Sequence, residues 1–257
     1  MQYRLGIVLS GGGSRGLAHA GVLRALAEEG IFPDCVAGTS SGALAGALYA
    51  SGRSAEETLR FFEDANPFRL SRLALRKPGF IDPEKIEHDL RRWFPDDRFE
   101  ALERPLFVTA TDLLAGRLEI FASGPLVRPL LASSSVPFVF TPIEVDGRLF
   151  ADGGIVNNFP IEPLIGLCDV ILGIYATPLS EPLATDLGST FAVSQRALEI
   201  GMFHASKRKF HDADLVLCPP ELGRFGTFDL KRHPEIAEIG YRAALERMEE
   251  IRALVGS

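Results

Sequence analysis

The residue types best suited to chemistry gather in three glycine-rich turns. The first is Gly11-Gly12-Gly13-Ser14-Arg15-Gly16, which follows an apolar run ending at Leu9 and precedes a helical pattern. Consecutive glycines at the start of a helix expose backbone N–H groups, and such groups bind an anion or a developing oxyanion. The segment therefore predicts an anion-binding or oxyanion-binding loop.

The same loop satisfies G-x-G-x-x-G, which is typical of dinucleotide-binding proteins. That function requires an acidic residue about twenty positions later, at the end of the second strand. Asp34 has roughly this spacing, but it precedes the expected second strand, 36–38. A nucleotide-binding P-loop is excluded because Leu17 and Ala18 stand where Lys and Ser or Thr are required. A dinucleotide-binding oxidoreductase remains an alternative.

The second turn, Gly38-Thr39-Ser40-Ser41-Gly42, matches G-x-S-x-G between a short strand and a helix. This is the context of a nucleophile elbow, a tight turn that exposes a serine hydroxyl. Ser40 would also lie at the positive end of the following helix dipole, where a developing negative charge is stabilised. We interpret Ser40 as a nucleophile, and the alternative is a plain helix cap.

A nucleophilic serine needs a base. His233 fits the chain order of an α/β-hydrolase triad, but it lies in a helix entry that we expect at the surface, and His19 is expected to be structural. The third turn, Asp152-Gly153-Gly154, offers a carboxylate directly after the expected strand 148–151. Its alternative is an ordinary Asp-Gly turn.

These turns separate an alternating series of strand and helix patterns. The expected strands are 4–9, 36–38, 106–111, 117–121, 143–145, 148–151, 170–175 and 214–217. The expected helices are 16–29, 41–51, 54–66, 82–94, 125–132, 187–209 and 234–254. Such alternation predicts an α/β fold, a single three-layer α/β/α domain over residues 1–257 with a mostly parallel central sheet. The motifs occupy about 4–218, and the closing helix covers about 234–254.

Composition narrows the class of protein further. Of the 257 residues, 46% are hydrophobic and the net charge is −7, so a large core is expected and nucleic acid is not an expected partner. Cys35, Cys168 and Cys218 are few and far apart in sequence, which predicts no disulfide framework and no metal site. The uncharged stretch 35–52 contains four glycines and favours strand, turn and helix over a transmembrane segment. We expect a cytoplasmic protein without a leader peptide.

Residues 67–80 differ from their surroundings. Leucines and phenylalanines alternate there with four cations, Arg69, Arg72, Arg76 and Lys77. Basic residues beside apolar ones suit an anionic membrane surface, which would make the protein a peripheral membrane partner. The alternatives are a lid and a structural connector whose apolar side chains pack inward.

Taken together, the three turns and the block Ala132-Ser133-Ser134-Ser135-Val136-Pro137 resemble the patatin-like phospholipase family in order and approximate spacing. The resemblance covers roughly residues 4–218. It implies a Ser–Asp dyad without histidine, with Ser40 as nucleophile and Asp152 as general base. It also implies an oxyanion hole formed by the glycine loop. The 132–137 block is similar to a family segment that supports the active site, without a chemical role of its own.

The implied function is a lipid acyl-ester hydrolase of the phospholipase A or esterase type, working through an acyl-enzyme. The oxyanion hole would comprise Gly11, Gly12, Gly13 and Arg15, supported by Gly16, Gly38, Gly42, Gly153 and Gly154. No cofactor and no metal are expected. Aspartate is a weaker base than imidazole, so direct contact and desolvation must make Asp152 more effective. A non-catalytic regulatory protein with the same fold remains a further alternative.

Overall fold

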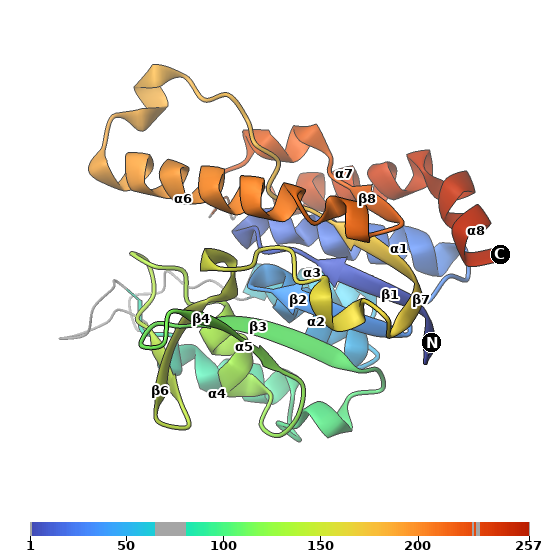
Figure 1. Ribbon diagram of the computed structural model, residues 1–257, viewed down its shortest axis with the longest axis horizontal. Coiled ribbons are helices and arrows are strands. Elements are labelled where there is room, and N and C mark those ends of the chain that lie inside the picture. The colour runs from blue at the N-terminus through green and yellow to red at the C-terminus, as the bar shows by residue number, and fades with distance from the viewer. Residues whose placement is uncertain (1, 65–80, 228, 230–231, 257) are drawn as a thin grey trace.

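The computed structural model describes residues 2–64, 81–227, 229 and 232–256 (Figure 1). Among these residues, eight strands form one sheet in the order β5-β6-β3-β2-β1-β7-β8, with β4 paired to β3. The strands are β1 (Tyr3–Leu9), β2 (Cys35–Thr39), β3 (Leu106–Asp112), β4 (Arg117–Phe121), β5 (Ile143–Val145), β6 (Arg148–Asp152), β7 (Cys168–Ile174) and β8 (Leu215–Leu217).

The centre of the sheet is parallel. β3, β2, β1, β7 and β8 all run in one direction, while β4 and β6 run antiparallel to β3. Parallel neighbours bring their carboxyl ends to one edge, so the loops after β1, β2 and β7 meet there. This edge collects the glycine loop and the predicted nucleophile.

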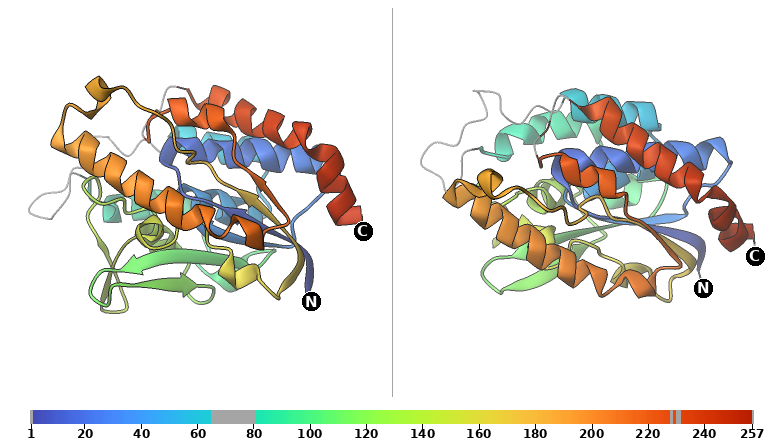
Figure 2. Two further views of the ribbon diagram at one scale, coloured as in Figure 1. Left: turned by 45° about the horizontal axis from the view of Figure 1, so that its top comes forward. Right: turned by 90° about the horizontal axis from the view of Figure 1, so that it is seen from above.

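Helices cover both faces of the sheet, so the prediction of an α/β fold is confirmed. They are α1 (Leu17–Glu28), α2 (Ser41–Ala50), α3 (Ala55–Asp64), α4 (Glu84–Trp93), α5 (Val127–Ser133), α6 (Thr190–Lys207), α7 (His233–Glu246) and α8 (Met248–Gly256). Figure 2 shows α1 and α7 side by side, with α6 on another flank of the molecule.

The two faces are covered unequally. Ile7 and Leu9 of β1 pack into the larger core, which also draws residues from helices α1, α2, α5, α7 and α8. Val8 points to the opposite face, into a smaller core around Phe159 and Tyr175, where α6 contributes the partly buried Phe203. The alternation of side chains along a strand produces this division. One layer is therefore thick, and the layer containing α6 is thin.

The sequence expectation for the closing helix needs correction. The single closing helix expected over 234–254 is broken at Arg247 into α7 and α8, and the break lets Met248 and Ile251 pack into the core. Cys35 and Cys168 are distant in sequence, yet their Sγ atoms lie 3.1 Å apart. They meet beside Gly6 of β1, where a Cβ would come within 2.7 Å of the Cys168 sulfur.

Segment 67–80, interpreted from sequence as an interfacial or connecting segment, lies outside the described residues. Within the part of the chain that the structure describes, no helix combines the length and apolarity needed to cross a membrane.

Candidate active site

Ser40 occupies the sharp turn between β2 and α2, as the G-x-S-x-G pattern predicts. Its backbone has φ 54° and ψ −125°, a conformation that residues with a side chain rarely adopt. Gly42 permits this turn, because a Cβ there would lie 2.2 Å from the Leu9 carbonyl oxygen. A Cβ at Gly38 would likewise meet the Gly42 carbonyl oxygen at 2.6 Å, and one at Gly16 the Ser41 hydroxyl at 2.3 Å. The elbow is thus packed backbone against backbone.

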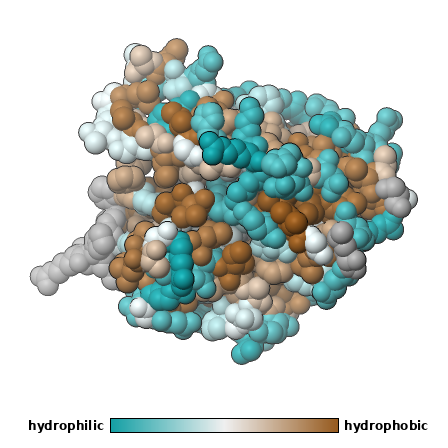
Figure 3. All heavy atoms as spheres, in the orientation of Figure 1, coloured by the Kyte–Doolittle hydropathy of each residue, from teal (hydrophilic) through white to brown (hydrophobic). Residues whose placement is uncertain are grey.

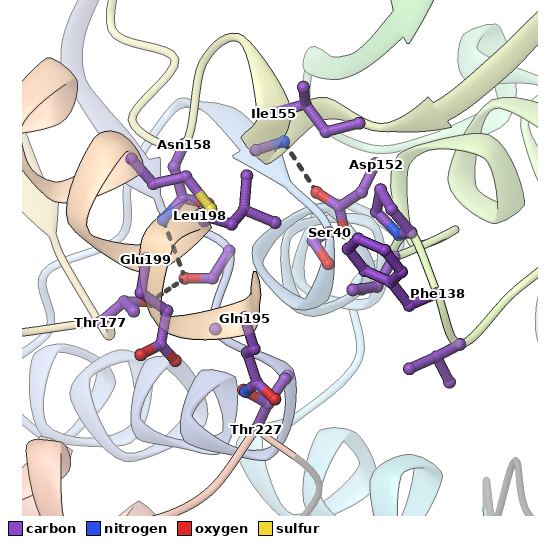
Figure 4. Close-up of a pocket in the computed structure, with 18 of the residues that line it drawn as sticks. Ser40, Phe138, Asp152, Ile155, Asn158, Thr177, Gln195, Leu198, Glu199 and Thr227 are labelled. Carbon is purple, nitrogen blue, oxygen red and sulfur yellow. Dashed lines mark hydrogen bonds between the residues drawn. The ribbon is translucent and has the colours of Figure 1, made fainter. Parts of the chain in front are cut away.

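Asp152 approaches Ser40 from a strand that runs antiparallel to β2 and β3. β3 continues beyond the end of β2, because Thr109 pairs with Thr39 and three further residues of β3 follow. Antiparallel β6 pairs with that extension and ends with Asp152 opposite Ala110. The last residue of β6 therefore lies one residue along β3 from the level of Thr39. Figure 4 shows the Ser40 and Asp152 side chains facing each other.

Burial sets the electrostatics of Asp152, whose side chain is 6% exposed. Desolvation raises its pKa from 3.8 to about 6, opposed by hydrogen bonds from the Ser40 side chain and the Gly154 N–H. The Gly154 N–H donates to the carboxylate Oδ1 at 2.7 Å. A Cβ at Gly153 would lie 2.4 Å from the Thr109 carbonyl oxygen, so this glycine allows the close approach that aims the carboxylate.

Two serines that the sequence left without a chemical role hold the pair in place. The Ser40 N–H donates to the Ser133 hydroxyl at 2.8 Å. The Asp152 N–H donates to the Ser135 carbonyl oxygen at 2.9 Å. The segment 132–137 therefore ties the elbow to the end of β6. No local pattern marks Ser133 for this contact, because its partner is 93 residues away.

The glycine loop faces the same site. Among the described residues, no acceptor binds the N–H groups of Gly11, Gly12 or Gly13. The Gly11 carbonyl accepts a hydrogen bond from the Thr177 hydroxyl at 2.8 Å. Because the trans peptide is planar, fixing that carbonyl turns the Gly12 N–H the opposite way. A Cβ at Gly11 would lie 3.1 Å from the Ser40 Cβ, so the loop passes directly beside the serine.

Arg15 is buried, at 4% exposure, and lines the pocket. Its Nε donates to the Gly12 carbonyl at 3.4 Å, and its Nη2 donates to Glu199 at 2.8 Å and to Thr227 at 3.1 Å. These contacts connect the glycine loop to α6. A direct part for Arg15 in anion binding stays a prediction.

The structure places the two histidines considered from the sequence in different surroundings. His19 is fully buried, with Nε2 2.8 Å from the Ser10 carbonyl, and burial lowers its pKa to about 4. His233 was expected at the surface, but it is only 6% exposed because the start of α7 packs into the protein. It lines a pocket that also includes Ser40, and burial lowers its pKa. His233 is therefore the histidine to test as a base.

Asp34 does not serve the glycine loop. It lies at the other edge of the sheet, before β2, and its carboxylate accepts from the N–H groups of Arg4 at 3.1 Å and Leu5 at 2.9 Å. An acidic residue that binds a ribose must instead follow its strand. This placement does not fit a dinucleotide site.

Two pockets meet at Ser40. The first, here the dyad pocket, has a volume of about 60 Å³ and contains Ser40, Asp152 and the glycine loop, with α6 along one side. The second, here the apolar pocket, has a volume of about 140 Å³ and is lined by side chains of α2, α3, α4 and α5 together with loop residues and His233. Leu44, Phe61, Ile86 and Leu131 are typical of its lining. Ser40 lines both pockets, whereas Asp152 lines the dyad pocket alone.

Comparisons with known proteins indicate one family. A family model for patatin-like phospholipases matches residues 7–165. An uncharacterized NTE family protein of Mycobacterium tuberculosis is 39% identical over 166 residues, which are 64% of this chain and 46% of that protein. Human patatin-like phospholipase domain-containing protein 6 is 34% identical over 169 residues, 62% of this chain and 12% of that protein. The lysophospholipase NTE1 of Pyricularia oryzae is 26% identical over 96% of this chain and 18% of its own length.

The chain thus spans less than half the length of these relatives.

Among solved structures, VipD from Legionella pneumophila matches with a TM-score of 0.58 and 14% identity, over 97% of this chain and 67% of that one. Human GIVD cytosolic phospholipase A2 bound to a fluorophosphonate inhibitor matches with a TM-score of 0.54 and 13% identity, over 99% and 59%. At these identities the likeness shows a shared fold.

Proposed function

Because the chain belongs to the patatin-like phospholipase family, we propose that it hydrolyses acyl esters of lipids with a Ser40–Asp152 dyad. The observation that carries this proposal is the meeting of three groups in one pocket. A serine on a tight elbow, a desolvated carboxylate and unpaired backbone N–H groups together supply a nucleophile, a base and an oxyanion site. Each group lies at the end of a different strand of the sheet, so the fold and not a local sequence pattern brings the three together.

In the proposed reaction, the Ser40 hydroxyl oxygen attacks the ester carbonyl carbon and passes its proton to Asp152. The tetrahedral intermediate then breaks its bond to the alcohol oxygen, which takes the proton from Asp152 and leaves. Water attacks the resulting acyl-Ser40 ester and passes a proton to Asp152. The bond between the acyl carbon and Ser40 Oγ then breaks, Oγ takes the proton back from Asp152, and the fatty acid is released. A carboxyl with a pKa near 6 suits both steps, because it accepts and returns a proton near neutral pH.

The glycine loop is proposed as the oxyanion hole. The Gly12 N–H is aimed by the Thr177 contact to the preceding carbonyl, and the Gly13 N–H is aimed by the contacts of Arg15 to the Gly12 carbonyl. Donors that are already oriented need no rearrangement as negative charge develops, and each contributes about 3–4 kcal/mol to transition-state stabilisation. In this scheme Arg15 acts by positioning the loop.

The substrate class follows from the apolar pocket. Its lining includes Ser40 and leucine, isoleucine and phenylalanine side chains of α2, α3, α4 and α5, and it does not include Asp152. A fatty-acyl chain placed there would hold its carbonyl carbon at the serine and leave the alcohol portion in the dyad pocket. The relative named as a lysophospholipase supports a phospholipid with one acyl chain as the first substrate to test.

The test combines covalent labelling with a substrate panel. The purified chain is treated with a fluorophosphonate and assayed on lysophosphatidylcholine, phosphatidylcholine, a monoacylglycerol and a soluble short-chain ester. We expect one label, on Ser40, and hydrolysis that disappears in Ser40→Ala. Labelling elsewhere, or full activity in Ser40→Ala, would contradict the proposal. A folded chain with neither label nor activity would instead indicate the non-catalytic alternative.

A further inference from the structure

Helix α6 (Thr190–Lys207) leaves apolar side chains exposed where an ordinary surface helix carries charges. Of its residues, only Ser206 is buried. The side that lines the dyad pocket carries Phe191, Leu198 and Met202 together with the polar residues Gln195 and Glu199. A helix that covers a soluble domain normally directs its charges outward and its apolar residues inward.

The charges of the N-terminal two-thirds of α6 are engaged on its inner side. Glu199 accepts from Arg15 at 2.8 Å, and the Arg196 guanidinium donates to the Ser180 carbonyl and lies 3.8 Å from Glu199. Both charged side chains are largely covered, at 21% and 17% exposure. Between Thr190 and Gly201 they are the two charged residues in the sequence.

The outer side of the same stretch is apolar. Val193 and Ile200 are 51% and 40% exposed, and Leu183 in the preceding segment is 71% exposed. Phe191 belongs to the pocket side of the helix but is still 43% exposed. The Phe191 ring packs edge-on against exposed Phe138, with centroids 6.4 Å apart, where both line the mouth of the dyad pocket. Figure 3 shows hydrophobic side chains gathered on the face of the molecule that carries α6. Exposed apolar groups at a pocket mouth are typical of an interaction surface.

We propose that this face, made of Leu183, Phe191, Val193, Ile200 and Phe138 and here named the α6 rim, docks onto the surface of a zwitterionic lipid bilayer. The inference rests on the proposed function, since Phe138 and Phe191 of the rim line the pocket in which a lipid ester would reach Ser40. Residues 183–201 contain Asp186, Arg196 and Glu199 as their charged side chains, and only Asp186 lies outside the inner ion pair. The stretch therefore offers no unengaged cation to select anionic lipid, and its attraction is apolar.

None of the rim residues belongs to the basic segment 67–80 considered from the sequence. An α6 helix lying in the interface would keep its pocket-lining side over Ser40 while its exposed side enters the headgroup boundary. The arrangement accounts for valine and isoleucine on the exposed side of this stretch.

The test uses the full chain with Ser40→Ala, so that binding is measured without hydrolysis. Sedimentation with phosphatidylcholine vesicles compares this parent with the rim variant Leu183→Gln, Val193→Gln, Ile200→Gln. The matched control is Phe32→Gln, Ile165→Gln, Leu245→Gln, at 53%, 53% and 41% exposure and outside the rim. We expect the rim variant to lose at least tenfold in vesicle binding and the control to bind as the parent does.

In the active background, the rim variant should keep hydrolysis of a soluble short-chain ester and lose hydrolysis of vesicle lipid. Vesicle binding that is unchanged in the rim variant, or reduced equally in the control, would overturn the inference. A parent dimer in gel filtration that only the rim variant disrupts would also overturn it, and would identify the rim as a contact between two copies. Failure of the proposed function would show differently, as binding to vesicles without hydrolysis of any ester.

Discussion

The dyad pocket has two walls built in contrasting ways. The sheet wall carries the glycine loop and the buried residues Ser40 and Asp152, whose N–H groups are both bound by the segment 132–137, at Ser133 and Ser135. The helix wall is α6, whose lining residues are half-buried and which is joined to the other wall by Arg15–Glu199 and Gln195–Thr227. The contrast indicates that the core of the protein positions Ser40 and Asp152. The peripheral helix α6 instead shapes the entrance to the dyad pocket.

The sharpest way to test the sheet wall is Asp152→Asn. Asparagine keeps the shape and still accepts from the Gly154 N–H, but it cannot accept a proton from Ser40. We expect hydrolysis of a soluble ester to fall by at least about 1,000-fold, measured as kcat/KM.

The same substitution should raise stability. The folded-state pKa of Asp152 is raised to about 6, so the wild type loses stability as pH rises from about 4 to about 6, and a neutral asparagine does not. Above pH 7 the variant should be more stable by up to about 3 kcal/mol in urea unfolding, and the difference should vanish near pH 3. A less stable variant at pH 8 would show that the carboxylate charge is compensated in the fold.

The pH–rate profile separates the carboxylate from a histidine. Because Asp152 must be ionised to act, kcat/KM should fall about tenfold per pH unit below about 6. An imidazole would give a similar position, so the profile alone does not identify the base. His233→Gln should change neither the fall in kcat/KM below about pH 6 nor the rate above it. If that fall is shifted or abolished in the variant, the base is His233.

A smaller effect on activity is expected from removing the hydrogen bond between the Ser40 N–H and the Ser133 hydroxyl. Ser133→Ala leaves the buried Ser40 N–H without its acceptor, which should cost about 1–3 kcal/mol of stability and roughly tenfold in kcat. Ser134→Ala is the matched control, because the buried Ser134 hydroxyl has no partner among the described residues. The two variants should differ in both thermal midpoint and turnover, and equal behaviour would remove Ser133 from the site.

The smallest effect should come from the helix wall. Gln195→Ala removes a hydrogen bond of 2.7 Å to Thr227 without touching the elbow or the carboxylate. We expect less than about threefold change in kcat on a soluble ester, since one neutral, partly buried hydrogen bond is worth about 1 kcal/mol. A loss comparable to that of Ser133→Ala would mean that the two walls act as one unit.

How far the sequence predicted this site depends on the range of each contact. The Ser40 elbow and the hairpin turn at Asp146-Gly147 follow from local patterns, because strand, turn and helix there are specified by adjacent residues. The α/β fold follows from alternation along the whole chain. Local preferences also account for the Ser54–Glu57 capping box, which the structure contains.

The remainder depends on pairings between distant segments. That Asp152 lies level with Ser40 depends on how far β3 extends beyond β2, and no local pattern sets this register. The burial of His233 and the pairing of Cys35 with Cys168 likewise depend on which strands and helices become neighbours. The role of Ser133 is visible only once α5 is seated beside the elbow.

The backbone angles of Ser40 carry a cost that two inactive variants can measure. At φ 54° a side chain is unfavourable, and such conformations store about 1–3 kcal/mol, held in place by the surrounding fold. Ser40→Ala keeps the Cβ and therefore the strain, whereas Ser40→Gly removes the strain. Glycine also makes the unfolded chain more flexible, which offsets part of the stability gained. Both variants lack the hydroxyl, so the difference in their unfolding free energies measures the backbone strain at this position. We expect the glycine variant to be more stable by about 1 kcal/mol. That difference is the free energy by which the strained turn destabilises the fold in order to hold a serine there.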